Sequence, residues 1–517
     1  MTRALRHVDR HLYLATLTLC VLVARLGLYG GDLAAQTFRT WLFRTHGFVL
    51  WDSRWFGGHT DVGYGPLFPV LASVLGIITV GIIACVASTM LFCALVPSNG
   101  TMATAAARAW FSVVVVVDLV VGRLPFACGL ACGMATVLAI RDRRPWLALL
   151  AAVGCSLFSP LAALFLLLVG AAWATEFGWR RVSPVAGGFI GLLIAQLGGD
   201  GGRFPFPGYM LTYLLLLAVG LLIVIPSRLT AARRGVVLYG VACVVLFIVP
   251  NPVGGNLARL ASLIAAPLVL LGATAVRRRT VPVVTAIMLG LLFWQTLPVG
   301  GAIAASRHDA SSSATYYAGV VAYLEGHAPV GSRVEVVPTA EHWESVYVAE
   351  HVSIARGWDR QVDLGRNDIL YGPLTTREYR SWLDANAVAY VALPRDTPLD
   401  YGAKSEAGLL ATPPSWLRTA YSDAHGHVWA VTNPQPMATG AAHVTADTPG
   451  GFDLDFTKPG TALVREYWSP YFTVQAGAAC VGPAPHGVTN VISQQAGSVA
   501  VVAVPRPDAH HRCPSIG

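Results

Sequence analysis

Long apolar runs recur through the first three hundred residues of this 517-residue chain and then stop. With 54% hydrophobic and 12% charged residues, the chain has more apolar sequence than one water-soluble core can use. Some runs are shorter than the ~20 residues that a straight helix needs to cross a bilayer. We therefore predict an α-helical polytopic membrane domain of about eleven spans. The runs lie at about 12–30, 70–96, 109–121, 126–140, 146–158, 161–174, 183–198, 209–226, 235–250, 257–276 and 281–299.

The rest of the chain has ordinary globular composition, which sets a domain boundary near residue 305. Expected helices at 313–326 and 375–386 alternate with expected strands at 333–338 and 388–393, as in a small α/β domain. From about residue 440, short strands such as 452–456, 462–468 and 499–504 lie between glycine and proline turns, as in a β-sandwich. The predicted domains are thus membrane helices over 1–305, an α/β domain over 306–435 and a β-rich module over 436–517.

Charge is divided between the same two halves. Residues 1–305 hold 22 arginines and 8 acidic residues, a net charge of +14, while residues 306–517 have a net charge of −6. The basic residues therefore belong to loops between membrane helices, and the acidic soluble part argues against nucleic acid as a partner.

The arginines also predict the orientation of the chain. Alternate loops, starting with the N-terminus, hold 15 arginines, whereas the opposite loops hold five. Arginine-rich loops face the cytoplasm, so we expect a multi-pass plasma-membrane protein with a cytoplasmic N-terminus and an uncleaved signal anchor. An odd number of spans then places the tail outside the cytoplasm, together with the long loop at 31–69.

This outer loop holds the strongest candidate for chemistry, because long loops between helices are uncommon without a function. Asp32 stands at the outer end of the first span, where a carboxylate is well placed to meet a lipid substrate. Aromatic residues of the loop can form an interfacial belt or, with its glycines, a folded surface suited to sugar rings. The candidate loop or acceptor-binding residues are Asp52, Trp55, His59, Asp61 and Tyr64.

Ionisable groups at the membrane boundary are costly unless they function or pair. Arg123, Arg203 and Arg259 are expected on the same outer side, and Asp118 precedes an outer loop. These residues can form a cavity that binds a phosphate while a carboxylate removes a proton. Each also has a structural interpretation, because an arginine can extend to the lipid headgroups and Asp118 can pair with a neighbouring arginine.

Two features of the tail concern cysteine and metal chemistry. Cys480 and Cys513 are the only cysteines there, and in an extracytoplasmic tail they can form one disulfide. The Glu341–Glu344 sequence, EHWE, lacks the HExxH spacing of a zinc helix. We predict no metal site and leave open whether a divalent cation is needed.

The N-terminal region resembles the glycosyltransferase C superfamily, especially its bacterial branch related to YfhO-type membrane proteins. The similarity lies in Asp32, in WDSRWFGG from Trp51, and in the YGPLFP entry to the next span. The tail resembles that of actinobacterial cell-envelope proteins of this branch, through Arg356–Asp363, Trp382–Pro394 and Trp468–Val474. The resemblance implies a polyprenyl-phosphate sugar as donor and an acidic residue of the first outer loop as base, a position that Asp32 matches.

The sequence therefore predicts an extracytoplasmic, inverting glycosyltransferase involved in cell-wall biogenesis. Asp32 would be the general base, and Arg259, Arg123 and Arg203 would bind the donor phosphate. Its expected partners are the lipid bilayer, the polyprenyl-phosphate donor and a glycan or lipid acceptor, with no certain cofactor. The alternative is a non-catalytic envelope protein that binds or presents a lipid-linked glycan. A transporter is third, because the spans show no obvious internal repeat.

Overall fold

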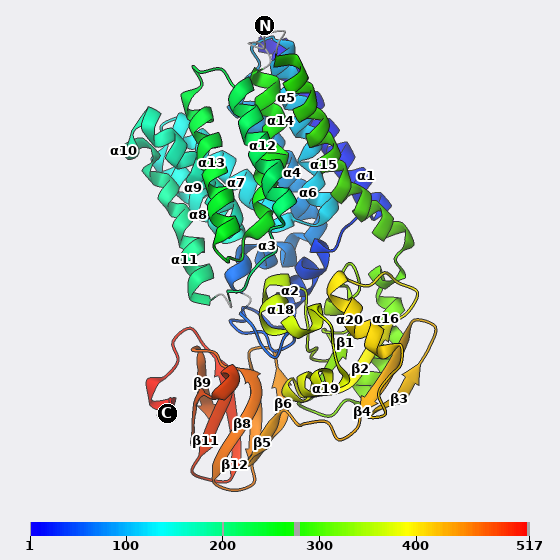
Figure 1. The fold of residues 1–517 in the computed structure, drawn as a ribbon. Helices are drawn as coiled ribbons and strands as arrows, with labels where there is room; N and C mark the ends of the chain where they lie inside the picture. The colour runs from blue at the N-terminus through cyan, green and yellow to red at the C-terminus, as the bar shows by residue number, and fades with distance from the viewer. Residues whose placement is uncertain (1, 61, 199–200, 273–279, 514–517) are drawn as a thin grey trace. The chain divides into compact units, whose positions relative to one another are not determined.

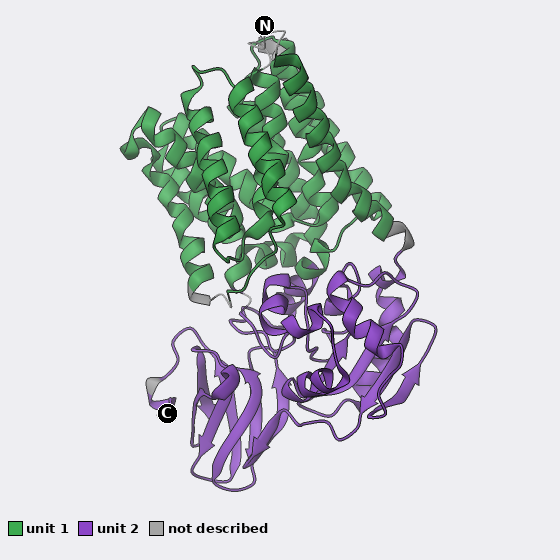
Figure 2. Ribbon diagram, viewed as in Figure 1, with its two compact units in different colours: residues 1–36, 63–307 green, residues 37–62, 308–517 purple. Residues whose placement is uncertain are grey.

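A computed structural model of the chain describes residues 2–60, 62–198, 201–272 and 280–513. The chain divides into two compact units (Figure 2). Unit 1 contains residues 1–36 and 63–307, and unit 2 contains residues 37–62 and 308–517. Three domains were expected from the sequence, whereas the whole tail lies in one unit, and that unit also contains most of the loop at 31–69.

Unit 1 is a bundle of α-helices (Figure 1). Its helices are α1 (Thr2–Leu26), the start of α2 (Asp32–His46), α3 (Leu67–Leu75), α4 (Ile77–Leu95), α5 (Met102–Val114), α6 (Val116–Val121), α7 (Leu124–Arg141), α8 (Pro145–Phe158), α9 (Pro160–Phe177), α10 (Trp179–Val182), α11 (Phe189–Gly198), α12 (Gly208–Val224), α13 (Thr230–Ile248), α14 (Ala258–Gly272) and α15 (Val281–His308). Short 3₁₀ turns are η1 (Val62–Tyr64), η2 (Ser183–Gly188) and η3 (Gly254–Leu257).

Seven helices among the described residues are long and apolar enough to cross a membrane, which confirms a multi-pass membrane protein. Two shorter apolar helices, α8 and α12, accompany them. Two predicted runs differ from single spans: 70–96 is broken at Gly76, which has φ 86°, and 183–198 contains η2 followed by the short α11. The prediction of about eleven spans counted apolar runs, which do not reveal such interruptions.

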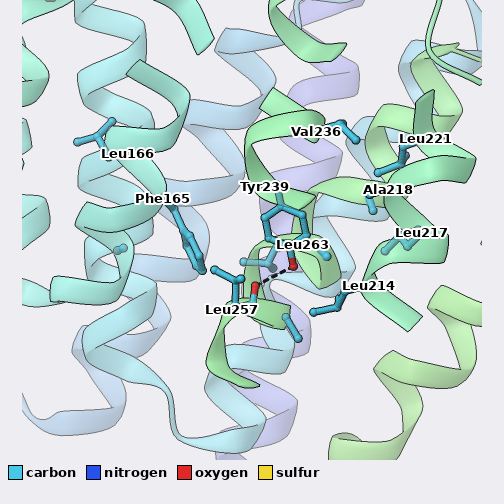
Figure 3. Packing of buried hydrophobic residues seen from close by; sticks show 14 of the residues in the cluster. Phe165, Leu166, Leu214, Leu217, Ala218, Leu221, Val236, Tyr239, Leu257 and Leu263 are labelled. Carbon is cyan, nitrogen blue, oxygen red and sulfur yellow. Dashed lines mark hydrogen bonds between the residues drawn. The ribbon is translucent and has the colours of Figure 1, made fainter. Parts of the chain in front are cut away.

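The core of unit 1 includes a cluster of aliphatic and aromatic side chains around Tyr239 (Figure 3). Phe165, Leu214 and Leu263 come from three different helices of this cluster. The Tyr239 hydroxyl is buried among them and donates a 3.0 Å hydrogen bond to the carbonyl oxygen of Leu257. A buried hydroxyl needs such a partner, and here the partner fixes the turn η3 that leads into α14.

Unit 2 begins with an α/β layer in which the strand order is β1-β2-β4-β3. β1 and β2 are parallel, and the other neighbouring pairs are antiparallel. Its elements include α16 (Ala314–His327), β1 (Arg333–Val336), α17 (Glu344–Tyr347), α18 (Arg360–Arg366), α19 (Thr376–Ala385), β2 (Val388–Pro394), α20 (Lys404–Leu410), β3 (Leu417–Ser422) and β4 (Gly426–Val431). The four predicted elements at 313–326, 333–338, 375–386 and 388–393 are confirmed as α16, β1, α19 and β2.

Two antiparallel four-stranded sheets follow, and their inner faces share one hydrophobic core. The strand orders are β10-β11-β8-β5 and β6-β7-β12-β9. The strands are β5 (Ala438–Gly440), β6 (Ala442–Thr448), β7 (Gly451–Phe456), β8 (Gly460–Tyr467), β9 (Phe472–Ala476), β10 (Ala479–Pro483), β11 (Val488–Ser493) and β12 (Gly497–Ala503). This arrangement confirms the expected β-rich C-terminal part.

A disulfide joins Cys480 of β10 to Cys513, with their Cα atoms 4.9 Å apart. It closes a segment of 33 residues, and a cross-link of that length removes conformational entropy mainly from the unfolded chain. We expect the Cys480→Ser/Cys513→Ser protein to lose about 2–4 kcal/mol of stability in the β-sandwich. Hydrogen exchange of β10 and β11 in the intact protein measures this loss. Unchanged exchange would show that the disulfide does not stabilise the module.

Residues 37–62 are part of the folded core of unit 2. Trp51 is buried, its ring packs edge-on against Phe472 at 5.5 Å, and its indole N–H donates a 2.8 Å hydrogen bond to Glu466. The indole N–H of Trp55 donates to the carbonyl oxygen of Ser345 at 2.9 Å. Unit 2 is therefore assembled from two stretches of sequence that are separated by most of the membrane helices.

Candidate active site

Asp32 is the first residue of helix α2. The Leu33 amide donates to the Gly30 carbonyl at 3.1 Å, and Gly30 itself donates to Val120 of α6 at 2.8 Å. A carboxylate in the first turn of a helix is favoured because it faces the positive end of the helix dipole. The side chain of Asp32 remains 26% exposed, so its position at the helix start leaves it open to a ligand.

Gly122 brings helix α6 close to this helix start. It caps α6 in the left-handed conformation, with φ 87°, which glycine adopts without strain. A Cβ atom at Gly122 would lie 2.3 Å from the Leu33 nitrogen, so no larger residue fits there. This close approach places Arg123, the next residue, beside Asp32.

Two arginines contact the Asp32 carboxylate. Arg123 Nε lies 3.4 Å from Asp32 Oδ2, and a terminal nitrogen of Arg259 lies 3.5 Å from the same oxygen. Arg259 is only 14% exposed and also lies over the ring of Phe126, 5.6 Å from its centroid. The three residues come from α2, the start of α7 and α14, and they combine two positive charges with one negative charge.

Arg259 is held in place by the core described above. It is the second residue of α14, directly after the 3₁₀ turn η3. The Leu257 carbonyl in that turn accepts the hydrogen bond from Tyr239. The Gly255 amide donates to the Pro205 carbonyl at 3.0 Å. These bonds fix the backbone that carries Arg259, so the guanidinium group is positioned before any ligand binds.

A cavity of about 210 Å³ lies beside these arginines, within unit 1. Arg123 and Arg259 line it, together with the 4% exposed Asp118. Its remaining polar walls come from Asn256, Ser262 and Gln295, and its apolar walls from α5, α6, α12, α14 and α15. Mostly apolar walls with a few convergent polar groups are typical of ligand-binding sites.

Asn256, Ser262 and Gln295 were not predicted from the sequence. Gln295 interrupts an otherwise apolar run, and a buried amide inside a predicted span was the available signal. Its side-chain amide donates a 2.5 Å hydrogen bond to the Ser262 carbonyl, which orients Gln295 along the cavity wall. Asn256 and Ser262 gave no comparable signal, because they lie in or beside short polar turns and small-residue stretches.

Two other predicted site residues of unit 1, Arg203 and Tyr64, do not line this cavity. Arg203 is exposed in the segment before α12, and in the described part of the chain no ion pair joins it to Asp32 or Asp118. Tyr64 lies in η1, is partly exposed and is an electrostatic neighbour of Arg259. Asp61 falls outside the described residues. Of the three arginines that were predicted to bind phosphate, Arg123 and Arg259 line the cavity and Arg203 does not.

Asp52, Trp55 and His59 are buried in unit 2, which corrects the expectation that they contact an acceptor. Asp52 and His59 form an antiparallel bridge, with backbone hydrogen bonds of 2.8 and 3.0 Å. The His59 ring stacks on Trp55 at 5.4 Å. Arg366 donates to the carbonyl oxygens of Phe56 and Gly58. These side chains hold the loop inside the core, so their faces are not available to a sugar.

His59 provides a test of this burial. Its Nδ1 lies 3.8 Å from Asp52 and its Nε2 lies 3.9 Å from Asp359. Burial, together with the charges of Arg39 and Arg366, lowers the pKa of His59 to about 3 from its ordinary 6.5. Below pH 6.5, His59 therefore binds a proton in the unfolded chain but not in the folded chain. The free energy of unfolding falls as the pH is lowered from 6.5 towards 3.

Between these limits His59 should contribute a slope of about 1.4 kcal/mol per pH unit to the unfolding free energy of unit 2. We expect His59→Gln to remove that slope, measured by hydrogen exchange of unit 2 at several pH values. The matched control is His443→Gln, because His443 is exposed on β6. Identical pH slopes for wild type and His59→Gln would contradict the assignment.

The EHWE sequence forms an ion-pair cluster within unit 2. His342 lies 3.2 Å from Glu344 and 3.6 Å from Asp400. The Arg360 guanidinium pairs with Asp400 at 2.6 Å, so a cation already occupies this position. Across the described residues, no group of three or more His, Cys, Asp or Glu side chains is arranged to hold a metal ion.

Comparison with solved structures finds chains of similar arrangement, among them that of ArnT. The crystal structure of ArnT from Cupriavidus metallidurans in the apo state covers 81% of this chain and 99% of its own, with 14% sequence identity and a TM-score of 0.39. No protein-family model matches the chain, and no curated protein matches it. At this identity and TM-score, the similarity to ArnT does not assign the chain to a family.

Proposed function

We propose that this chain is a membrane glycosyltransferase that transfers a sugar from a polyprenyl-phosphate donor to a cell-envelope glycan or lipid. One observation carries the proposal: the Asp32 carboxylate lies 3.4 and 3.5 Å from two arginines that line a cavity among the membrane helices. Guanidinium groups suit a lipid phosphate, and a carboxylate suits removal of a proton from an acceptor hydroxyl.

The arrangement supports distinct roles for the three residues. Arg123 and Arg259 bind the donor phosphate and stabilise the negative charge that it gains as the bond to the sugar breaks. Because the two arginines then face the phosphate, Asp32 is free to accept the proton of the acceptor hydroxyl. That oxygen attacks the anomeric carbon, and the lipid phosphate leaves from the opposite side with inversion of configuration.

An extracytoplasmic reaction agrees with two independent features. The arginine distribution favours a cytoplasmic N-terminus. The Cys480–Cys513 disulfide is typical of protein segments outside the cytoplasm. A lipid-linked donor suits that location because nucleotide sugars are not expected there.

The lipids that copurify with the protein test the class of donor. We expect mass spectrometry of purified wild-type protein to find polyprenyl-phosphate sugars enriched over bulk phospholipid. Arg123→Gln/Arg259→Gln should lose this enrichment, because its cavity lacks both guanidinium groups. A control with Arg143→Gln and Arg144→Gln removes two exposed arginines of another loop. Lipids in the same proportions as the source membrane in every sample would argue against the proposal.

A further inference from the structure

The charges around the cavity balance before any ligand enters. Arg123 and Arg259 contribute two positive charges, and Asp32 and Asp118 contribute two carboxylates. A lipid phosphodiester adds one further negative charge. An uncompensated charge in a site of low polarity is costly. Binding of a phosphodiester lipid must therefore be accompanied either by a cation or by protonation of one of the carboxylates.

Asp118 and Asp32 differ in how much each would gain from being neutralised by a proton. Asp32 is partly exposed and contacts both arginines. Asp118 is 4% exposed, and its Oδ2 is buried without a hydrogen-bond partner among the described residues. No ion pair in the described part of the chain includes Asp118, although it lines the same cavity. A carboxyl oxygen in this position gains most from holding a proton.

The groups that face Asp118 come from the elements packed around α6. Arg123 precedes α7, Arg259 belongs to α14 and Asp32 begins α2, and all three act on Asp118 electrostatically. Cys85 of α4 is a further titratable neighbour of Asp118. When a phosphodiester engages the two arginines, the charges of the two arginines, Asp32, Asp118 and the ligand sum to one negative charge, which a proton on Asp118 would neutralise.

We propose that binding of a phosphodiester lipid in this cavity is coupled to uptake of one proton, and that Asp118 holds that proton. This inference rests on the proposed function in one respect, namely that the ligand is a phosphodiester lipid. A proton on Asp118 converts a repulsive carboxylate into a hydrogen-bond donor directed at the cavity, so the neutral side chain can also help to position the ligand. Asp118 is thus a positioning residue and takes no part in proton removal from the acceptor.

The test uses a ligand that does not titrate. The probe is the methyl phosphodiester of a short-chain prenol, which carries one negative charge from about pH 5 to about pH 9, and the uncharged prenol is its reference. Calorimetry of the full-length protein in detergent, in two buffers of different ionisation enthalpy, counts the protons that are taken up. Where Asp118 is ionised in the free protein, affinity should fall about tenfold for each unit of rising pH.

Asp118→Asn imitates the protonated side chain in size and charge. We expect it to bind the phosphodiester without proton uptake and with an affinity that no longer depends on pH. Asp142→Asn, which alters an exposed carboxylate, should keep the wild-type behaviour. The wild-type proton count tests the inference even if the Asp118 variant does not fold.

Three results would overturn the inference. They are a wild-type protein that binds the probe without proton uptake at every pH, an Asp118→Asn protein that still takes up a proton, and binding that requires a divalent cation and is lost with a chelator. Proton-coupled binding without any sugar transfer would instead overturn the proposed function and leave this inference standing. Sugar transfer together with an affinity for the probe that does not depend on pH would overturn this inference and leave the proposed function standing.

Discussion

Replacing Asp32 with asparagine should lower the rate of sugar transfer by about 10²–10⁴-fold, the usual contribution of a general base. Asparagine keeps the size of the side chain but cannot accept the proton. Asp32 is partly exposed at the start of α2 and is not part of a hydrophobic core, so the protein should fold normally. Binding of the donor lipid should remain, because Arg123 and Arg259 are still present and lose only their internal partner.

The measurement is the single-turnover rate at saturating donor, compared with a separate binding experiment on the same preparation. Asp142→Asn is the control, because Asp142 is an exposed carboxylate beside Arg141. It should transfer sugar at the wild-type rate. If Asp32→Asn binds the donor and transfers sugar as fast as the wild type, Asp32 is not the base.

Replacing Arg333 with methionine should destabilise unit 2 by about 3–5 kcal/mol, because it leaves Glu466 buried without its charge partner. Arg333 is fully buried, pairs with Glu466 at 2.5 Å and donates to the carbonyl oxygens of Asn386 and Arg465 at 3.1 and 2.7 Å. Glu466 also accepts the hydrogen bond of Trp51. This one ion pair therefore connects the α/β sheet, the β-sandwich and residues 37–62 within unit 2.

Hydrogen exchange of β1 and β8 in the intact protein gives the change in opening free energy. Arg333→Met/Glu466→Gln should recover part of the loss, because the unpaired charge is removed. Arg418→Met is the control, since Arg418 is exposed on β3. Equal exchange in the wild type and Arg333→Met would show that the ion pair does not stabilise unit 2.

Local sequence patterns predicted most of the elements but not how distant segments assemble. Apolar runs predict helices, and alternating runs predict the strands of the tail, because both depend on neighbouring residues. The contact of Trp51 with Glu466 joins residues 415 positions apart, and a single sequence holds no local signal for it. The assignment of residues 37–62 to unit 2 was missed for that reason.

The candidate site was only partly predicted, because it too depends on contacts between distant segments. The topology placed Asp32, Arg123 and Arg259 on one side, but their meeting depends on the close approach at Gly122 and on the turn held by Tyr239. Arg203 is also an arginine predicted on the outer side, but among the described residues no comparable contact brings it to Asp32. For Trp55 and His59, aromatic composition alone could not distinguish a sugar-binding surface from a buried core.

Sugar transfer at the cavity beside Asp32 is tested most directly with purified, reconstituted protein. The protein is given a radiolabelled polyprenyl-phosphate sugar together with envelope glycan and lipid acceptors. We predict a labelled glycan or glycolipid of inverted anomeric configuration and release of polyprenyl phosphate. Donor that binds to the protein but stays intact with every acceptor would contradict sugar transfer and favour a protein that only binds or presents a lipid-linked glycan.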